Sequence, residues 1–537
     1  MYHLSFLRIT LLASLLMLAG TSLQAQSWML QQSLPPLDTN LKAQDQFGFS
    51  VALTDSFMIV GSPQHEYDLA GDNRIFASGA AFVYKRSPQG QWQQTQKLVA
   101  PTRAGVAFYG NRVAINEDWI IVSAYQGPND SINNTGEVYC YAFDTGSEEW
   151  VLDTALSSPQ AQLFMQFGRS LSLSDNRLLI GAAGDELDAN GQNQIDDAGA
   201  AYVYEYVSGQ GWTFLQKIVA SDRGDNSFFG QTVSLSGDYL CVGAPNHTLD
   251  PLTNPLIEGG QVYLFEYNAS TLQYEEVQKL RDQTAASLGK YGQDLSLWQD
   301  RLMIGKTNES DFDGNFVSRG GAVEYYERQS GGSWQFVQEL RPSVQRTDAF
   351  FGRVQLQGDI ALIGAYGEPY ALDMADSVAG GGAAYIFVRS PQGQWLETDK
   401  FAPNDRARFD EFGQVVALSG QDAIVGSPFA AVDSALFDAG KLYAYQRDWP
   451  LAIEPQAEQS LRLYPNPATE KVVMHWPGYE IESLRISDLQ GKNWHLRSLE
   501  MRAETIHLHL PDIPAGLYYI VVRSTDGLRQ VQRLQIK

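Results

Sequence analysis

The chain has 537 residues and a formal net charge of −24, with acidic residues scattered along its length. An acidic surface repels phosphate backbones, so we expect no nucleic-acid partner. The length allows one large repeat domain and a smaller second domain, and the abundance of Tyr, Phe, Trp and Gly favours β-structure.

Residues 1–25 are typical of a secretory signal peptide. Arg8 gives a positive start, an apolar stretch runs from Ile9 to Ala19, and the small residue Ala25 follows Gly20. No later run is apolar and long enough to cross a bilayer, so we expect no transmembrane segment. The sequence therefore predicts an exported, soluble protein, and we expect a monomer.

An aromatic residue followed by glycine recurs at intervals of 58 to 62 residues. After each pair, a polar turn such as SDN or SGD separates two alternating apolar runs, which is typical of a β-hairpin. A second small residue, usually glycine, stands 13 positions after the first glycine, or 12 in the sixth copy. Such a period indicates a repeat architecture. The first glycines are Gly48, Gly110, Gly168, Gly230, Gly292, Gly352 and Gly413.

Two more strands complete each repeat. A third strand, such as GAAYVYEY, follows a variable loop, and a fourth strand begins with an aromatic residue 18 positions before the next glycine. We expect these aromatic residues to pack between blade edges. They are Trp92, Trp150, Trp212, Tyr274, Trp334 and Trp395.

The ends of the repeat region complement each other. The last copy stops after its third strand, and the mature chain begins with an unpaired fourth strand at 28–38. If that strand completes the last sheet, the sheets close into a ring and expose no open edge. The sequence predicts an all-β fold, a seven-bladed β-propeller over residues 27–449 whose strand 28–38 closes the last blade.

The two cysteines lie inside strand-like runs about a hundred residues apart. Although export would permit a disulfide, we expect Cys140 and Cys241 to be buried, unpaired thiols.

The spacing of these motifs resembles the FG-GAP repeat of integrin α-subunit propellers and bacterial surface proteins. In integrin-like copies, a DxDxDG calcium loop connects the first two strands. Here that connection is only a tight turn, such as SDN, so the resemblance carries no calcium site to this chain.

A second domain follows a short linker at 450–460. Alternating strands broken by Gly, Pro and Asp-Gly predict a small Ig-like β-sandwich at 461–537. Its Tyr464–Ala468 stretch, the turn at Ile486–Gly491 and the Gly516-Leu517-Tyr518 motif resemble the type A sorting domain of the type IX secretion system of Bacteroidetes. The resemblance implies that the secretion machinery recognises this domain and delivers the protein to the cell surface or the exterior.

The loops between the second and third strands vary most in length, so we expect them to form the binding face with the blade-to-blade links. Two of these loops are acidic and could supply oxygen ligands to calcium, although neither has a standard calcium spacing and a solvated loop is the alternative. The first offers Asp185, Asp188, Asn190, Asp196 and Asp197, and the second offers Asp311, Asp313 and Asn315.

Other motifs have simpler explanations. Arg223-Gly224-Asp225 forms an RGD tripeptide, but Arg103, Arg346 and Arg406 stand in comparable links, so we interpret Arg223 as a structural link residue. His507 and His509 alternate along a predicted strand, which indicates an exposed polar strand face rather than a metal site. His65 and His247 occupy equivalent loops with no second metal ligand of their type nearby.

No local catalytic motif is apparent in the sequence. We therefore expect a secreted or surface-displayed protein that acts in adhesion or in the recognition of an extracellular protein or glycan, with no catalytic residues and no firm cofactor. The alternative is an extracellular enzyme that acts on polysaccharide, which would need carboxylates or a histidine at the mouth of the central channel. A purely structural surface component is a third hypothesis.

Overall fold

The computed structural model describes residues 28–447, apart from 39, 128–133, 251, 254, 283–287, 309, 313–314 and 372–376, together with most strand residues of 462–536. The predicted signal peptide and linker lie outside these residues. All regular structure in the described part is β-strand. No described helix is long and apolar enough to cross a membrane.

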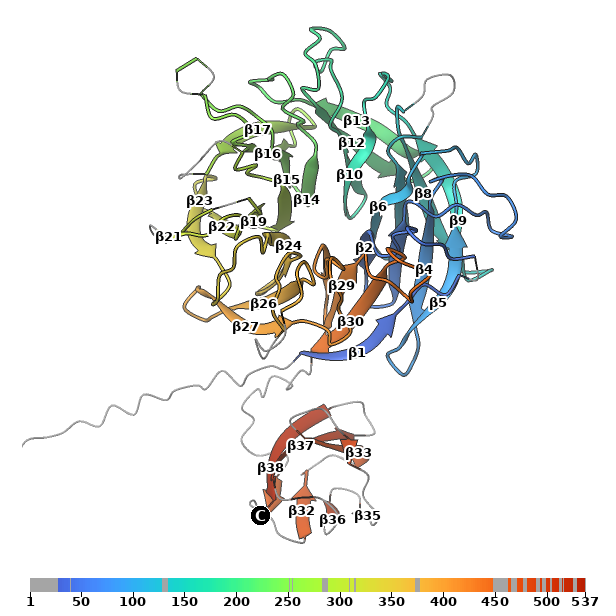
Figure 1. Ribbon diagram of the computed structural model, residues 1–537, viewed down its shortest axis with the longest axis vertical. Coiled ribbons are helices and arrows are strands. Elements are labelled where there is room, and N and C mark those ends of the chain that lie inside the picture. Colours follow the sequence, from blue (N-terminus) through green and yellow to red (C-terminus); the bar gives the residue numbers. More distant parts are fainter. Residues whose placement is uncertain are drawn as a thin grey trace, which may run out of the picture.

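Seven four-stranded antiparallel sheets are arranged around a central axis (Figure 1). We number them as blades 1 to 7 in chain order. Blades 1 to 4 comprise β2 (Ser50–Leu53), β3 (Phe57–Ser62), β4 (Ala80–Arg86) and β5 (Trp92–Leu98); β6 (Tyr109–Ile115), β7 (Trp119–Ala124), β8 (Glu137–Asp144) and β9 (Glu149–Leu156); β10 (Phe167–Ser174), β11 (Arg177–Ala182), β12 (Ala200–Val207) and β13 (Gly211–Ile218); β14 (Thr232–Ser236), β15 (Tyr239–Ala244), β16 (Gln261–Asn268) and β17 (Gln273–Leu280).

The remaining blades follow the same plan. Blade 5 also carries a short hairpin in its variable loop. Blades 5 to 7 comprise β18 (Asp294–Trp298), β19 (Arg301–Lys306), the hairpin β20 (Asp311–Phe312) and β21 (Asn315–Phe316), β22 (Ala322–Arg328) and β23 (Trp334–Leu340); β24 (Phe351–Gln357), β25 (Ile360–Ala365), β26 (Ala383–Arg389) and β27 (Trp395–Phe401); β28 (Val415–Ser419), β29 (Asp422–Ser427), β30 (Lys441–Arg447) and β1 (Trp28–Leu34).

The N-terminal strand completes blade 7. The order of that sheet is β1-β30-β29-β28, and β1 runs antiparallel to β30 from the Trp28–Arg447 pair to the Leu34–Leu442 pair. The strand is shorter than the 28–38 segment predicted, because Pro35 and Pro36 have no N–H to donate to a ladder. The ring of seven blades confirms the predicted propeller.

At most blade interfaces the second glycine of one repeat lies against the first glycine of the next repeat. A Cβ on Gly364 would lie 1.9 Å from the carbonyl oxygen of Gly413, the repeat glycine of the next blade. A Cβ on Gly61 would lie equally close to the oxygen of Gly110. Gly413 also has a φ of 89°, in the left-handed region that favours glycine. The repeat therefore keeps both glycines because neighbouring backbones touch there.

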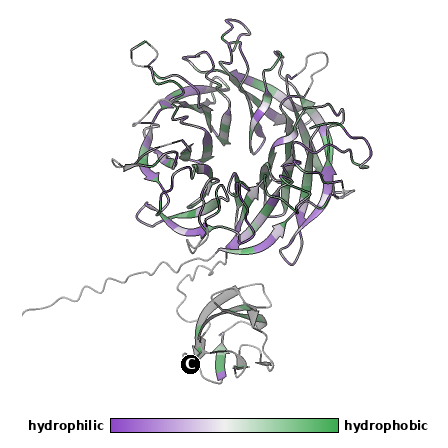
Figure 2. Ribbon diagram, viewed as in Figure 1, coloured by the Kyte–Doolittle hydropathy of each residue, from purple (hydrophilic) through white to green (hydrophobic). Residues whose placement is uncertain are grey.

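Apolar cores lie between adjacent blades. One core combines Leu179 and Val203 of blade 3 with Val233 and Val242 of blade 4. Figure 2 shows hydrophobic residues on the strands of every blade. The fourth-strand aromatics join these interfaces: Trp395 of blade 6, for example, packs edge-on against Tyr325 of blade 5, with ring centroids 5.3 Å apart. The predicted packing role of this series is confirmed there.

Both cysteines are buried and free, as predicted. Cys140 lies on β8 and Cys241 on β15, so different blades hold them. Burial raises the pKa of each thiol. Neither is therefore a ready nucleophile.

The C-terminal domain forms two antiparallel sheets, with the strand orders β31-β32-β36-β35 and β34-β33-β37-β38. Buried residues of both sheets, including Met474 and Ile520, share one core, as in a β-sandwich. The strands are β31 (Arg462–Tyr464), β32 (Lys471–His475), β33 (Ile481–Asp488), β34 (Asn493–Trp494), β35 (Leu499–Arg502), β36 (Thr505–His509), β37 (Gly516–Ser524) and β38 (Arg529–Ile536).

Candidate functional site

The blade-to-blade links and the variable loops lie at the same end of the propeller. In the link into blade 2, the N–H of Val106 donates to the carbonyl of Phe76 in the variable loop of blade 1 (2.9 Å). The N–H of Leu288 donates likewise to the carbonyl of Ile257 (2.8 Å). We call this end the loop face.

Exposed apolar side chains stand on several links of the loop face. Phe164, Leu288 and Phe409 are each more than half exposed, at 57%, 57% and 56%. Each lies four positions before a repeat glycine and has a positive φ, at 62°, 68° and 65°. This conformation is unfavourable for bulky residues, so the link geometry holds these side chains outward against a local backbone preference.

Asp185, a predicted calcium ligand, is used inside blade 3. Its side chain is fully buried and lies 2.9 Å from the Lys217 ammonium. It also accepts hydrogen bonds from the hydroxyl of Tyr202 (2.5 Å) and the amide of Gln162 (2.8 Å). Since an ammonium and two neutral donors already surround both oxygens, the observed role of Asp185 is to anchor the start of the loop.

The other acids of this loop do not converge. The Asp188 carboxylate accepts backbone N–H bonds from Asn190 and Gln192, both 2.9 Å long, and a side-chain bond from Asn193. These bonds lower the pKa of Asp188. Asp196 instead offers its carbonyl to the next link, where the N–H of Asn226 donates to it (2.9 Å). The Asp188 carboxylate therefore stabilises a local turn of the loop through bonds to residues two to five positions later.

Burial, with Asp196 and Asp225 nearby, raises the pKa of Asp197. In the second acidic loop, Asp311 pairs with Phe316 in the hairpin β20–β21, and Asn315 pairs with Phe312. Asp313 lies outside the described residues. Within the described part of the chain, no three His, Cys, Asp or Glu side chains form a group that could hold a metal ion. Calcium binding by these loops stays a prediction.

The RGD arginine is held by the propeller itself. Arg223 donates to the carbonyl of Asn193 (2.7 Å) and to that of Glu186 (2.6 Å), both in the preceding variable loop. Arg103, in the link into blade 2, donates in the same way to the carbonyls of Asn73 and Glu66. Two links therefore use the same arginine clamp, which confirms the structural interpretation of Arg223.

The two loop histidines have different partners. His65 is fully buried, and its Nδ1 lies 2.9 Å from Asp45. In blade 4, Nδ1 of His247 lies 3.0 Å from the hydroxyl of Ser227. Burial lowers the pKa of His247, with Asp222 opposing the shift and Lys279 adding to it. Both side chains thus connect a blade-to-blade link with a variable loop. The side chains of His507 and His509 on β36 lie outside the described part of the structure.

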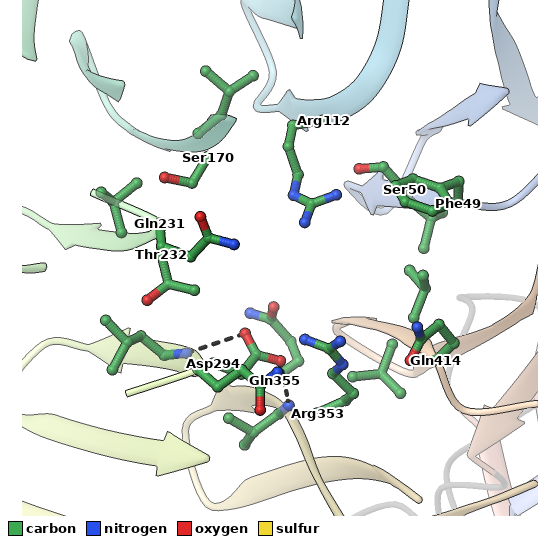
Figure 3. Close-up of a pocket in the computed structure, with 18 of the residues that line it drawn as sticks. Phe49, Ser50, Arg112, Ser170, Gln231, Thr232, Asp294, Arg353, Gln355 and Gln414 are labelled. Carbon is green, nitrogen blue, oxygen red and sulfur yellow. Dashed lines mark hydrogen bonds between the residues drawn. The ribbon is translucent and has the colours of Figure 1, made fainter. Parts of the chain in front are cut away.

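A cavity of about 360 Å³ lies in the central channel, lined by the innermost strands of the blades. Figure 3 shows polar side chains from several blades directed into it, among them Arg112, Gln231, Asp294 and Arg353. Arg169 also lines it. We call Arg112, Arg169 and Arg353 the arginine triad, which comes from β6 of blade 2, β10 of blade 3 and β24 of blade 6.

Aromatic rings support the triad and place it at the loop face. The guanidinium of Arg169 lies over Tyr125 (5.2 Å to the ring centroid), and that of Arg353 lies over Tyr366 (5.7 Å). Each tyrosine directly follows a second strand, where a variable loop begins. Tyr366 is itself stacked on Phe350, with centroids 4.9 Å apart. The cationic groups are therefore held near the loop-face mouth by cation–π contacts.

The triad has few hydrogen-bond partners in the described part of the chain. Arg112 donates to the carbonyl of Asn111 (2.9 Å), and Nε of Arg169 donates to the side chain of Gln231 (3.3 Å). Nε of Arg353 is buried without a partner. Arg86, by contrast, forms a bidentate pair with Asp422 at 2.5 and 2.9 Å. Within the described residues the cavity arginines thus lack the carboxylate partner that Arg86 has.

Burial and like charge both act against the triad cations. Burial lowers the pKa of Arg112 to about 9, and the neighbouring Arg169 and Arg353 add to this effect. Burial is also the main cause of the lowered pKa of Arg169. An arginine otherwise stays protonated to far above neutral pH. The excess of arginines over carboxylates in the cavity lining contrasts with the net charge of −24 of the whole chain.

Asp294 is the one carboxylate among the residues that line the cavity. Its oxygens accept backbone N–H bonds from Leu295 and Val354, each 3.1 Å long. Burial raises its pKa, although Arg353 and Arg112 oppose that shift. The remaining polar lining consists of hydroxyls and amides, of which Gln414 has a buried Oε1 without a partner. The cavity can therefore donate many hydrogen bonds but holds no pair of acids.

The sequence contained a signal for this site that our expectations missed. The residue after each repeat glycine is long and polar in most copies, and one or two positions later the lining continues with smaller or apolar side chains. In six blades this position lines the channel cavity, whereas in blade 2, where the β6–β7 ladder is irregular, Arg112 lines it in place of Asn111. The six residues are Phe49, Arg169, Gln231, Gln293, Arg353 and Gln414.

The strands and their closure define a repeat β-propeller with a second all-β domain. Residues 28–84, 92–141, 150–204, 212–265 and 395–445 match the FG-GAP repeat, and residues 462–537 match the secretion system C-terminal sorting domain. The chain is an FG-GAP repeat propeller protein with a type IX sorting domain, which confirms both resemblances. Type IX secretion exports it to the cell surface or the extracellular space.

Comparison with curated proteins gives no match. Among solved structures, yeast (Saccharomyces cerevisiae) Sqt1 is similar at 10% identity and a TM-score of 0.41, covering 78% of this chain and 100% of that one. A Lactobacillus plantarum protein (10%, 0.41, 68% and 86%) and the periplasmic gluconolactonase of Pseudomonas aeruginosa (14%, 0.41, 67% and 86%) are also similar. At such TM-scores these likenesses carry no argument about activity.

Proposed function

We propose that this protein is an extracellular recognition protein that binds a protein or glycan ligand at the channel mouth on the loop face. The observation that carries the proposal is the cavity of about 360 Å³, to which several blades contribute polar side chains. Its volume lies in the usual range for ligand sites. Every blade contributes a residue from the start of its innermost strand, so the repeat array can vary the ligand without altering the framework.

The surroundings of the cavity also support recognition. Exposed apolar side chains such as Phe164, Leu288 and Phe409 stand on the links of the same face. Their backbone conformation is unfavourable for bulky residues, so the links hold these side chains where a ligand at the channel mouth could contact them. The proposed ligand would therefore enter the channel with one group and contact the loop face with another.

The polysaccharide-degrading alternative is less well supported by the cavity. Hydrolysis of a glycosidic bond commonly uses two carboxyl groups that flank the bond. Asp294 is the single carboxylate among the lining residues, and both of its oxygens accept backbone N–H bonds. The lining thus offers hydrogen-bond donors for binding but no acid–base pair for this reaction.

The proposal is tested by binding the exported full chain to arrays of glycans and extracellular matrix proteins, once with calcium and once with chelator. We expect a specific ligand whose binding is weakened by Gln414→Ala, in the cavity, and not by Gln210→Ala, on an exposed turn. Loss of binding in chelator would also support calcium at the acidic loops. The absence of any specific ligand, or one indifferent to Gln414→Ala, would contradict the proposal.

A further inference from the structure

The arginine triad points to the chemistry of the ligand. Arg112, Arg169 and Arg353 come from three different blades and line one cavity. In the described part of the chain none of them has a carboxylate within ion-pair distance, whereas Arg328 pairs with Glu266 across a blade interface (2.9 Å). Asp294 in the same cavity attracts Arg112 and Arg353 without forming an ion pair, so one carboxylate faces three guanidinium groups. This excess of buried positive charge is unfavourable by itself, and an anion that joins it would offset it.

The triad is also positioned in advance. Tyr125 and Tyr366 lie against two of the guanidiniums, and Phe49 lies 5.7 Å from the third. Contacts with ring faces leave the N–H edges of a guanidinium available, and these edges match the oxygens of carboxylate, sulfate or phosphate. Little side-chain order would be lost on binding, which favours affinity.

The other lining groups suit a ligand rich in hydroxyls. Gln231, Gln293, Gln355 and Gln414 line the same cavity, and the amide side chain both donates and accepts hydrogen bonds. Oε1 of Gln414 is buried without a partner. A sugar ring presents hydroxyls in several directions and is small enough for a cavity of this volume.

We propose that the channel mouth binds an acidic sugar residue, with its oxyanion on the arginine triad and its hydroxyls on the surrounding glutamines. The inference rests on the proposed recognition function and names the ligand class of the same site. The oxyanion is a carboxylate, as in a uronic acid, or a sulfate ester, and both present oxygens that guanidinium groups can share. Burial and the neighbouring arginines lower the pKa of Arg112, and a bound anion would raise it again, which agrees with this assignment.

The test compares sugars that share the glucose ring and differ in the group at C6, which is charged in two of them and neutral in the third. Binding of glucuronic acid, glucose 6-sulfate and glucose to the exported full chain is measured by titration calorimetry or ligand-observed NMR. We expect at least one acidic sugar to bind about tenfold or more tightly than glucose, because charge-assisted hydrogen bonds have this strength. Added salt should weaken the binding. The preferred acidic sugar identifies the oxyanion.

Two cavity variants and one control assign the binding to the triad. Arg353→Gln should weaken binding of the acidic sugar about tenfold or more, and Arg353→Lys should weaken it less, because it keeps the charge but loses the planar fork. Arg281→Gln removes the same charge from an exposed site beside Asp250 and should have no effect. Thermal unfolding checks each fold, and losing one of three repelling cations should not lower the melting temperature.

Several outcomes would overturn the inference. These are equal affinity for glucose and the acidic sugars, unchanged affinity in a folded Arg353→Gln variant, or binding of inorganic phosphate or an acidic peptide with no binding of either acidic sugar. A protein or neutral glycan found on the arrays, with no acidic-sugar binding, would leave the recognition function standing and reject the triad assignment. Failure in both experiments would reject both.

Discussion

Individual polar residues in this propeller divide into those that hold loops in place and those that face the channel. Asp185 was a predicted calcium ligand, Arg223 belongs to the RGD tripeptide and His65 lies in a variable loop, and each is bonded to a neighbouring link, loop or strand. Arg353, by contrast, lines the cavity and has no carboxylate partner in the described part of the chain. The hydrogen-bond and ion-pair partners of a side chain therefore separate structural from functional candidates better than its residue type does.

Buried His247 makes the stability of blade 4 sensitive to acid. Its pKa is lowered in the folded state, so the unfolded chain takes up the proton more readily. The stability contribution is complete above the unfolded pKa of about 6.5 and is lost as the pH falls from there through the folded pKa. His247→Asn, which can keep the contact with Ser227, should lose less stability between about pH 7.5 and pH 5.5 than the natural chain.

Urea unfolding at a series of pH values measures this difference. Above about pH 7.5 the two proteins should respond to pH in parallel, because His247 is then neutral in both states. Equal loss of stability on acidification would show that His247 does not carry the effect.

Among the elements, the contact between neighbouring blades depends on the small residue that ends the second strand. At blade 6 this residue is Gly364 on β25, whose added Cβ would overlap the carbonyl oxygen of Gly413. The two nearest atoms belong to the Gly413 backbone, which cannot move aside as a flexible side chain could. The inner strands are thereby kept close enough to form a continuous channel wall.

Gly364→Ala should destabilise the propeller by about 1–3 kcal/mol or more, as overpacking does. Gly331→Ala is the matched control, since a Cβ there meets nothing within 4 Å. That change should be neutral or slightly stabilising because it restricts the unfolded chain. Urea midpoints measure both variants, and equal midpoints would contradict the proposed backbone contact.

At the scale of the whole molecule, β1 joins the two ends of the repeat array. Trp28 and Leu34 of this strand are buried, and Trp28 packs edge-on against Phe401 of blade 6. Without β1, the edge of β30 and this part of the core would be exposed. The ring is therefore closed by hydrogen bonds between residues about 400 positions apart, as in the Trp28–Arg447 pair.

Deleting 28–38 should lower the melting temperature of the propeller more than deleting 461–537. The first change removes a strand from blade 7, whereas the second removes a domain with its own core. Calorimetry of both truncated chains measures the difference, and size-exclusion chromatography should show association through the exposed edge of the first. Comparable melting of the two would argue against closure as a source of stability.

The sequence by itself determined the number of blades, the place of closure and the export route. Each feature depends on a motif that is local, repeated or terminal. The period of the glycines gives the number of blades, the unpaired strand at 28–38 gives the place of closure, and the ordered motifs of 461–537 give the export route. The predicted strand end at Asp38 was too late, because two prolines end the ladder after Leu34. Local physics accounts for both the success and the error.

Only the tertiary structure decided which side chains meet. Arg112 and Arg353 are 241 positions apart in the sequence, and nothing local to either one indicates that both line the same cavity. From the sequence Asp185 is an acid in a variable loop, whereas in the structure it pairs with Lys217 on β13. A repeat sequence specifies each blade separately, but the closed ring brings equivalent positions together around one axis. The site is a property of that closure.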